Sequence, residues 1–292
     1  MSMTSEGTPK PPRKMRSRFK PEVKAGMRLE ERDLKLLCDL FLHRLMSRSQ
    51  LERLYFTSAS RCNVRLRQMF DHNLVSRYYL PLAPFGAQCI YSLGKAGVVP
   101  VSRRLEWEPD EVERQANRHK TPQFLEHTLA INETRLAFRD ALKAETTWKL
   151  GRWIPEIQCR HEYDIRLAGD KWQREVFKPD GFVRLQNRET RQNASFFLEI
   201  DMGHTSSSKF ADKLESHTRY LESSLFREVF GEADFRTLVL TTGPRRLKNL
   251  REIVEGKGSR LFLFSTFDEM NSRGVTSQIW HFPFEKATQQ LV

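Results

Sequence analysis

Apolar residues in the first third of the chain recur at helical spacings and then give way to a strand pattern. Residues 34–46 place Leu or Phe at intervals of three and four, which predicts an amphipathic helix. The elements expected after it are helices through residues 51–55 and 61–70, then strands at 77–80 and 88–93 around a turn containing Pro and Gly. Three helices followed by a two-stranded hairpin is the order of a winged helix-turn-helix.

The pattern after residue 120 is different and predicts a mixed sheet. Thr121-Pro122 begins a strong helix that is expected to end near Lys143. The strands expected after it lie at 148–150, 162–167, 175–177, 182–185, 195–200, 236–241 and 261–264, with helices at 207–230 and 244–255. This order predicts an α/β (α+β) protein whose second half is a restriction-endonuclease-like mixed-sheet domain.

These patterns divide the chain into four segments. They are a basic disordered tail at 1–25, a winged helix-turn-helix DNA-binding domain at 26–104, a linker at 105–120 and a restriction-endonuclease-like α/β domain at 121–292. The tail holds seven Lys or Arg, two Asp or Glu and four Pro, so it has too little apolar surface to fold alone. It is either an arm that contacts DNA or a disordered leader.

The basic excess of the chain is confined to one region. Residues 1–104 contain 20 Lys or Arg and 8 Asp or Glu, whereas the remaining 188 residues contain 29 of each kind. The whole net charge of +12 therefore lies in the first third. A concentrated basic excess indicates binding to a polyanion, because neutralised phosphates release their counterions. The predicted partner is double-stranded DNA.

The third predicted helix occupies the position of a recognition helix, which enters the major groove of DNA. Arg pairs there with guanine, and Gln or Asn pairs with adenine. The candidate DNA-binding residues are Arg61, Asn63, Arg65, Arg67 and Gln68 on this helix, with Arg77 on the first strand of the hairpin. The alternative is that some of them are solvated or contact phosphates only. Winged-helix proteins often pair on two-fold sites, which favours a homodimer.

A second group of candidate residues is acidic. Asp180 follows Pro179, and Glu199-Ile200-Asp201 ends an apolar run nineteen residues later. If both segments are adjacent strands, three carboxylates converge, and oxygen ligands of this kind suit Mg²⁺ or Mn²⁺. The candidate metal ligands are Asp180, Glu199 and Asp201, and the candidate catalytic residues are these three with Lys213.

The role of Asp201 stays open at this point. Metal-dependent nucleases of this pattern usually carry Lys at that position, so Asp201 either binds a second metal ion or leaves the lysine's role to Lys213. A third interpretation is that Pro-Asp-Gly is an ordinary turn and that the acidic residues only cap the backbone. The fold is then a degenerate nuclease kept for binding. Mg²⁺ or Mn²⁺ is the expected cofactor if the protein is an enzyme, and none otherwise.

Other function classes lack their motifs. The four cysteines form no C-x-x-C pair, no apolar run approaches the length of a membrane helix, and the N-terminus lacks the apolar centre of a signal peptide. These features predict a reduced, cytoplasmic protein with no membrane partner. A phosphate-binding Gly-rich loop and the His triad of a relaxase are also missing from the sequence.

Several short motifs together carry a family resemblance. They are Leu93-Gly94-Lys95-Ala96-Gly97, His127, Pro179-Asp180, Glu199-Ile200-Asp201 with Gly203, and Lys213 with Tyr220. With these motifs, residues 30–265 resemble the replication-relaxation family of plasmid and mobile-element proteins. The resemblance implies a DNA-binding role in replication, mobilisation or its regulation, alongside other replication or mobilisation proteins. The alternative is a metal-dependent endonuclease that the winged helix directs to its target.

Overall fold

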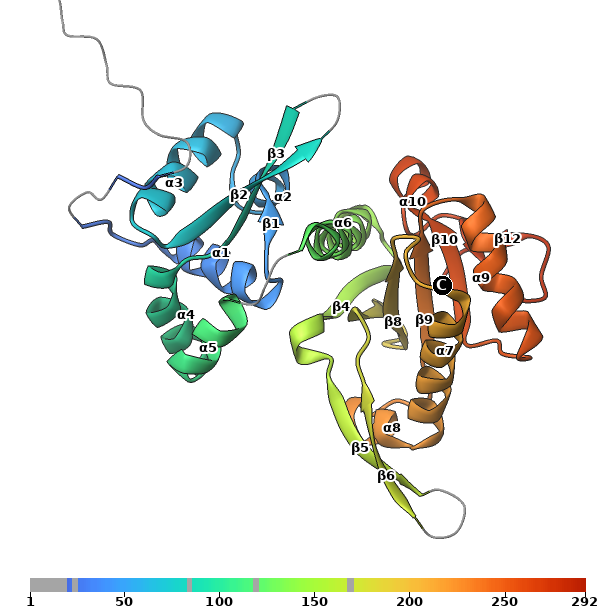
Figure 1. The fold of residues 1–292 in the computed structure, drawn as a ribbon. Coiled ribbons are helices and arrows are strands. Elements are labelled where there is room, and N and C mark those ends of the chain that lie inside the picture. The colour runs from blue at the N-terminus through green and yellow to red at the C-terminus, as the bar shows by residue number, and fades with distance from the viewer. Residues whose placement is uncertain (1–19, 23–25, 83–85, 118–120, 167–170) are drawn as a thin grey trace, which may run out of the picture.

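The computed structural model describes residues 20–22, 26–82, 86–117, 121–166 and 171–292, so the predicted tail at 1–25 lies outside it except for residues 20–22. Figure 1 shows two units with helix α6 between them. Their elements confirm the predicted α+β class, including a mixed sheet. Within the described residues, no helix combines the length and the hydropathy needed to span a membrane.

The N-terminal unit contains three helices and a small antiparallel sheet, in the order that the sequence predicts. The helices are α1 (Glu31–Leu42), α2 (Arg48–Tyr55) and α3 (Ala59–Asp71), and the strands are β1 (Met46–Ser47), β2 (Val75–Leu82) and β3 (Gly86–Leu93). Ser47 and Ser58 cap α2 and α3, because each hydroxyl accepts a backbone N–H of the first turn. Strand β3 lies between β1 and β2.

The chain leaves the β2–β3 hairpin through a tight contact with the turn after α3. A Cβ atom added at Gly94 would lie 2.3 Å from the carbonyl oxygen of Asn73, and one added at Gly97 would lie 2.6 Å from that of Leu74. These distances exclude any side chain at either position. The two glycines of the Leu93–Gly97 motif are therefore required by packing, whatever the function of the protein.

The expected linker at 105–120 is largely helical. Helix α4 (Val98–Leu105) packs on α1, and helix α5 (Pro109–Ala116) follows after a short turn. Val112 of α5 is fully buried in the N-terminal core, and the Trp107 ring meets Phe41 edge-on at 5.2 Å. The sequence did not predict this helix, because α5 buries only one residue and so has no apolar periodicity.

The C-terminal unit is built on a seven-stranded mixed sheet. Its strands, in spatial order, are β12 (Thr288–Gln289), β11 (Trp280–His281), β10 (Phe262–Thr266), β9 (Arg236–Thr241), β8 (Asn193–Asp201), β7 (Gly181–Asn187) and β4 (Trp148–Pro155). The β8–β9 and β9–β10 pairs are parallel, and the others are antiparallel. A separate ribbon, β5 (His161–Arg166) with β6 (Trp172–Phe177), projects from the unit (Figure 1).

Helices cover both faces of this sheet. Helix α6 (Pro122–Ala144) and α10 (Phe267–Arg273) pack on one face, and α7 (Ser207–Glu222), α8 (Leu225–Phe230) and α9 (Pro244–Gly256) pack on the other. The single helix expected at 207–230 is interrupted at Ser224, whose φ of 63° is left-handed. The interruption turns α8 toward the aromatic cluster around Phe197.

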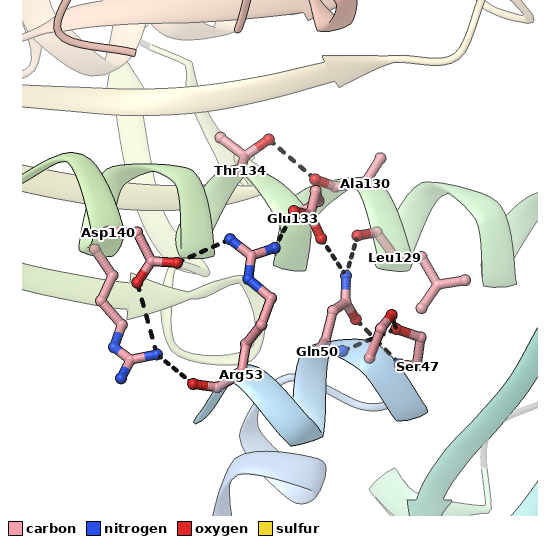
Figure 2. Close-up of polar contacts among 10 residues, drawn as sticks. Ser47, Gln50, Arg53, Leu129, Ala130, Glu133, Thr134 and Asp140 are labelled. Carbon is pink, nitrogen blue, oxygen red and sulfur yellow. Dashed lines mark hydrogen bonds and ion pairs between the residues drawn. The ribbon is translucent and has the colours of Figure 1, made fainter. Parts of the chain in front are cut away.

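Helix α6 joins the two units. Figure 2 shows Gln50 and Arg53 of α2 reaching Glu133 of α6, and Arg53 also pairs with Asp140 at 2.9 Å. On the same helix Asn132 is buried and donates a 2.6 Å hydrogen bond to the carbonyl of Leu45. The Arg53 contacts are exposed, whereas the Asn132 hydrogen bond is buried, so Asn132 fixes the N-terminal unit on α6 most firmly.

Candidate functional site

The three predicted carboxylates come together at one end of strands β7 and β8. Gly181 pairs with Leu198, so Asp180 and Glu199 occupy neighbouring strand positions, and Asp201 follows two residues later on the same face. Asp180, Glu199 and Asp201 are 8%, 3% and 5% exposed. Their convergence agrees with the spacing argument from the sequence. We call these residues the carboxylate cluster.

Asp180 is bound by helix α6 and by the neighbouring strand. Its Oδ2 atom accepts the backbone N–H of Ile200 at 2.7 Å and lies 3.2 Å from Nε2 of His127. Burial alone would raise the pKa of Asp180, but His127, Lys213 and the Ile200 N–H together outweigh burial and hold the pKa below its usual value. In the same way Asp180 raises the pKa of His127 against the opposing effect of burial. The pair therefore favours an ionised carboxylate on Asp180 and a protonated imidazole on His127.

Glu199 is held by helix α7. The ammonium of Lys213 donates to Oε2, and His217 contacts Oε1 at 2.8 Å. The other ring nitrogen of His217 lies 2.9 Å from the hydroxyl of Thr237. Attraction to Glu199, with a further contribution from Asp180, raises the pKa of Lys213 despite burial. The sequence prediction placed Lys213 here but missed His217, although it lies four residues later on the same helix face.

Asp201 has a cationic partner that the sequence analysis did not identify. Arg246 of α9 donates from Nε to Oδ2 at 2.8 Å and from Nη2 to Oδ1 at 3.0 Å, a two-point contact. The hydroxyl of Thr241 donates to Oδ2 at 2.7 Å. Burial alone would raise the pKa of Asp201, but these hydrogen bonds outweigh it and lower the pKa.

These contacts do not fit the predicted Mg²⁺ or Mn²⁺ site. A metal ligand directs its oxygens at a shared ion, whereas Asp180, Glu199 and Asp201 each bind a different cationic or imidazole side chain. In the part of the chain that the structure describes, no group of three or more His, Cys, Asp or Glu residues is arranged to hold a metal ion. Lys213 and Arg246 supply the positive charge that an ion would otherwise provide.

Tyr220, the aromatic member of the family motif, lies in a different environment. It is fully buried and stacks on Phe177 with ring centroids 4.0 Å apart. Burial raises the pKa of its hydroxyl. A tyrosine in this position packs the core beneath α7 and does not reach a DNA strand as a nucleophile.

The predicted DNA-binding residues of α3 fall into two groups. The first group, Arg65 and Arg67, pairs with carboxylates of the same unit. Arg65 donates to both carboxylate oxygens of Asp33, which is completely buried at the start of α1. Arg67 pairs with Asp71 one turn later, at 2.7 Å between Nη2 and Oδ1. The guanidinium of Arg65 therefore neutralises a buried carboxylate of its own unit, and base contact by Arg65 and Arg67 stays a prediction.

The second group faces solvent. Arg61, Asn63 and Gln68 are exposed on α3. Asn63 and Gln68 line a groove of about 810 Å³ between this helix and residues 26–30, where Arg28 lines the opposite wall. Arg77 of β2 lies over the Phe70 ring, with its guanidinium carbon 4.2 Å from the ring centroid. These side chains leave a polar, basic surface on the outer side of α3.

Comparison with known families adds one finding. The family model described as replication-relaxation matches residues 37–232, a range that contains α3, the hairpin, Asp180, Glu199 and Lys213. No curated protein matches the chain. Because the family match spans more than half of the 292 residues, the chain belongs to the replication-relaxation family.

Proposed function

We propose that this protein binds a specific sequence in duplex DNA and acts in the replication or mobilisation of a plasmid or another mobile element. The family supports the biological setting. The N-terminal unit supports the activity, because three helices followed by a β-hairpin are the parts of a winged helix-turn-helix. We interpret α3 as its recognition helix and the β2–β3 hairpin as its wing.

One observation carries this proposal. The outer surface of α3 presents Arg61, Asn63 and Gln68, and it belongs to the segment that holds the whole net charge of +12. A helix of this kind supplies hydrogen bonds to base edges, while the surrounding Lys and Arg supply the phosphate contacts. The carboxylate cluster gives no comparable support for catalysis, because its charges are already balanced by Lys213 and Arg246.

DNA binding of this type is expected to depend steeply on salt. If about six phosphates are contacted, the affinity falls about 10³-fold between roughly 50 and 200 mM salt. Fluorescence anisotropy with a duplex selected from a random pool measures this slope. Arg61→Ala is expected to weaken binding to the selected duplex by at least about five-fold.

Arg188→Ala provides the matched control, since Arg188 is also exposed but lies in the β7–β8 turn of the C-terminal unit, outside the segment that holds the basic excess. It is expected to leave affinity unchanged. Equal losses of affinity in the two variants, or equal affinity for the selected duplex and for unrelated sequences, would contradict the assignment of α3 as the recognition helix.

We also propose that the protein binds its site as a homodimer. A two-fold pair of recognition helices reads two half-sites about one helical turn apart and doubles the phosphate contacts. The selected sequences are then expected to be inverted repeats. Light scattering of the protein–DNA complex should give two chains per duplex; one chain per duplex on a site without symmetry would refute the dimer.

The alternative function is a metal-dependent endonuclease, and the convergence of Asp180, Glu199 and Lys213 is its support. Since these residues do not fit a resident ion, we expect no cleavage of supercoiled, linear or single-stranded DNA with Mg²⁺ or Mn²⁺. Gel assays over a range of metal concentrations test this. Cleavage that disappears in Glu199→Gln would establish the endonuclease and overturn this expectation.

A further inference from the structure

An exposed apolar residue lies in the middle of the polar surface of α3. Val64 is 57% exposed, although the other large apolar residues of this helix, Leu66, Met69 and Phe70, are buried. Arg61, Val64 and Gln68 have the spacing of one helix face. The valine therefore lies between two side chains that are able to donate hydrogen bonds to base edges. Single exposed apolar side chains are common on protein surfaces, so it is the position of Val64 that carries information.

The chemistry of the major groove identifies what such a residue meets. Each base edge there offers hydrogen-bond donors and acceptors, and the C5-methyl group of thymine is the one apolar feature. The basic excess of residues 1–104, the segment that contains α3, favours a polyanion over an apolar protein surface as the occupant of this face. Resting on the proposed DNA-binding function, we infer that Val64 packs against a thymine methyl group and selects for thymine at that position.

Gln68 contributes a second, oriented contact. Its Oε1 atom accepts a 3.1 Å hydrogen bond from Nη1 of Arg65, which is itself held by Asp33. This contact engages the carbonyl oxygen of the Gln68 side chain and leaves its NH₂ group to donate. Arg65 is a positioning residue in this arrangement, and Gln68 donates to a base acceptor, such as a purine N7 or the thymine O4, one helical turn from the methyl contact.

The test compares thymine with deoxyuridine, which differs only by the methyl group. The full-length protein first selects duplexes from a random pool, and each thymine of the selected duplex is then replaced separately. For the wild-type protein, replacement at one position per half-site is expected to weaken binding about four-fold, the effect of one buried methyl group. Val64→Ala is expected to bind the thymine duplex with a similar loss and to be insensitive to deoxyuridine at that position.

Val99→Ala is the matched control, because Val99 is also an exposed valine, at 48%, but lies on α4. It should retain wild-type affinity and sensitivity to deoxyuridine. The inference is overturned if no single thymine is sensitive, or if Val64→Ala keeps the wild-type sensitivity. Failure to select any duplex would instead refute the proposed function, so the two failures are distinguishable. Thermal unfolding of both variants confirms that they are folded.

Discussion

Arg65→Ala is expected to lower the free energy of unfolding by about 3–5 kcal/mol, because it leaves a buried carboxylate without its main cationic partner. Asp33 is completely buried, and Arg65 donates to both of its oxygens. Asp33 also accepts the backbone N–H of Glu30, so the same carboxylate caps α1. The loss would therefore affect both the packing of α3 on α1 and the start of α1. Urea unfolding of the variant and the wild type measures it.

The pH dependence of this loss follows from Asp33. Burial alone would raise the pKa of Asp33, but hydrogen bonds from Arg65 and Glu30 lower it. A depressed pKa stabilises the fold above the unfolded value of about 4, and that stabilisation is lost as the pH falls through the folded value. The deficit of Arg65→Ala should therefore be largest near neutral pH and should shrink under acid conditions.

Arg61→Ala separates stability from DNA binding on the same helix. Arg61 is exposed one turn before Arg65, and its substitution is expected to change stability by less than about 0.5 kcal/mol while weakening DNA binding. If Arg65→Ala proved as stable as Arg61→Ala and lost only DNA affinity, the assignment of Arg65 to Asp33 would be wrong.

Arg246→Met is expected to have the second large effect, a loss of about 3 kcal/mol, because Asp201 then keeps only the Thr241 hydroxyl and backbone donors. The double variant Arg246→Met/Asp201→Asn removes both charges. It should recover part of the loss, since a neutral buried pair has no uncompensated charge. Denaturant unfolding of the two single variants and the double variant gives their coupling energy.

Arg245→Met is the control for this series, because Arg245 precedes Arg246 on α9 but is exposed. Its stability should match that of the wild type. The series also tests how the carboxylate cluster is neutralised. If Arg246→Met were as stable as the wild type, or were stabilised by added Mn²⁺, Asp201 would be available to a metal ion and the nuclease alternative would gain support.

The sequence by itself determined those features that depend on neighbouring residues. Helices α1, α3 and α6 and strands β7 to β10 follow from apolar periodicity and capping residues within each segment. The convergence of Asp180 with Glu199 followed from strand order, since adjacent antiparallel strands place them side by side. Segments with a weak local pattern were missed, including α5 with one buried residue and the two-residue strands β1, β11 and β12.

Only the tertiary structure decided which charged groups pair. Arg246 reaches Asp201 from 45 residues away, Arg65 reaches Asp33 from 32, and His127 of helix α6 contacts Asp180, which precedes strand β7. The chain contains 49 Lys or Arg and 37 Asp or Glu, so composition and spacing permit many pairings. Long-range packing selects one, because a buried charge is tolerated only where the fold brings a partner to it. For this reason the sequence located the carboxylate cluster, whereas the fold showed that its charges are balanced by its own side chains.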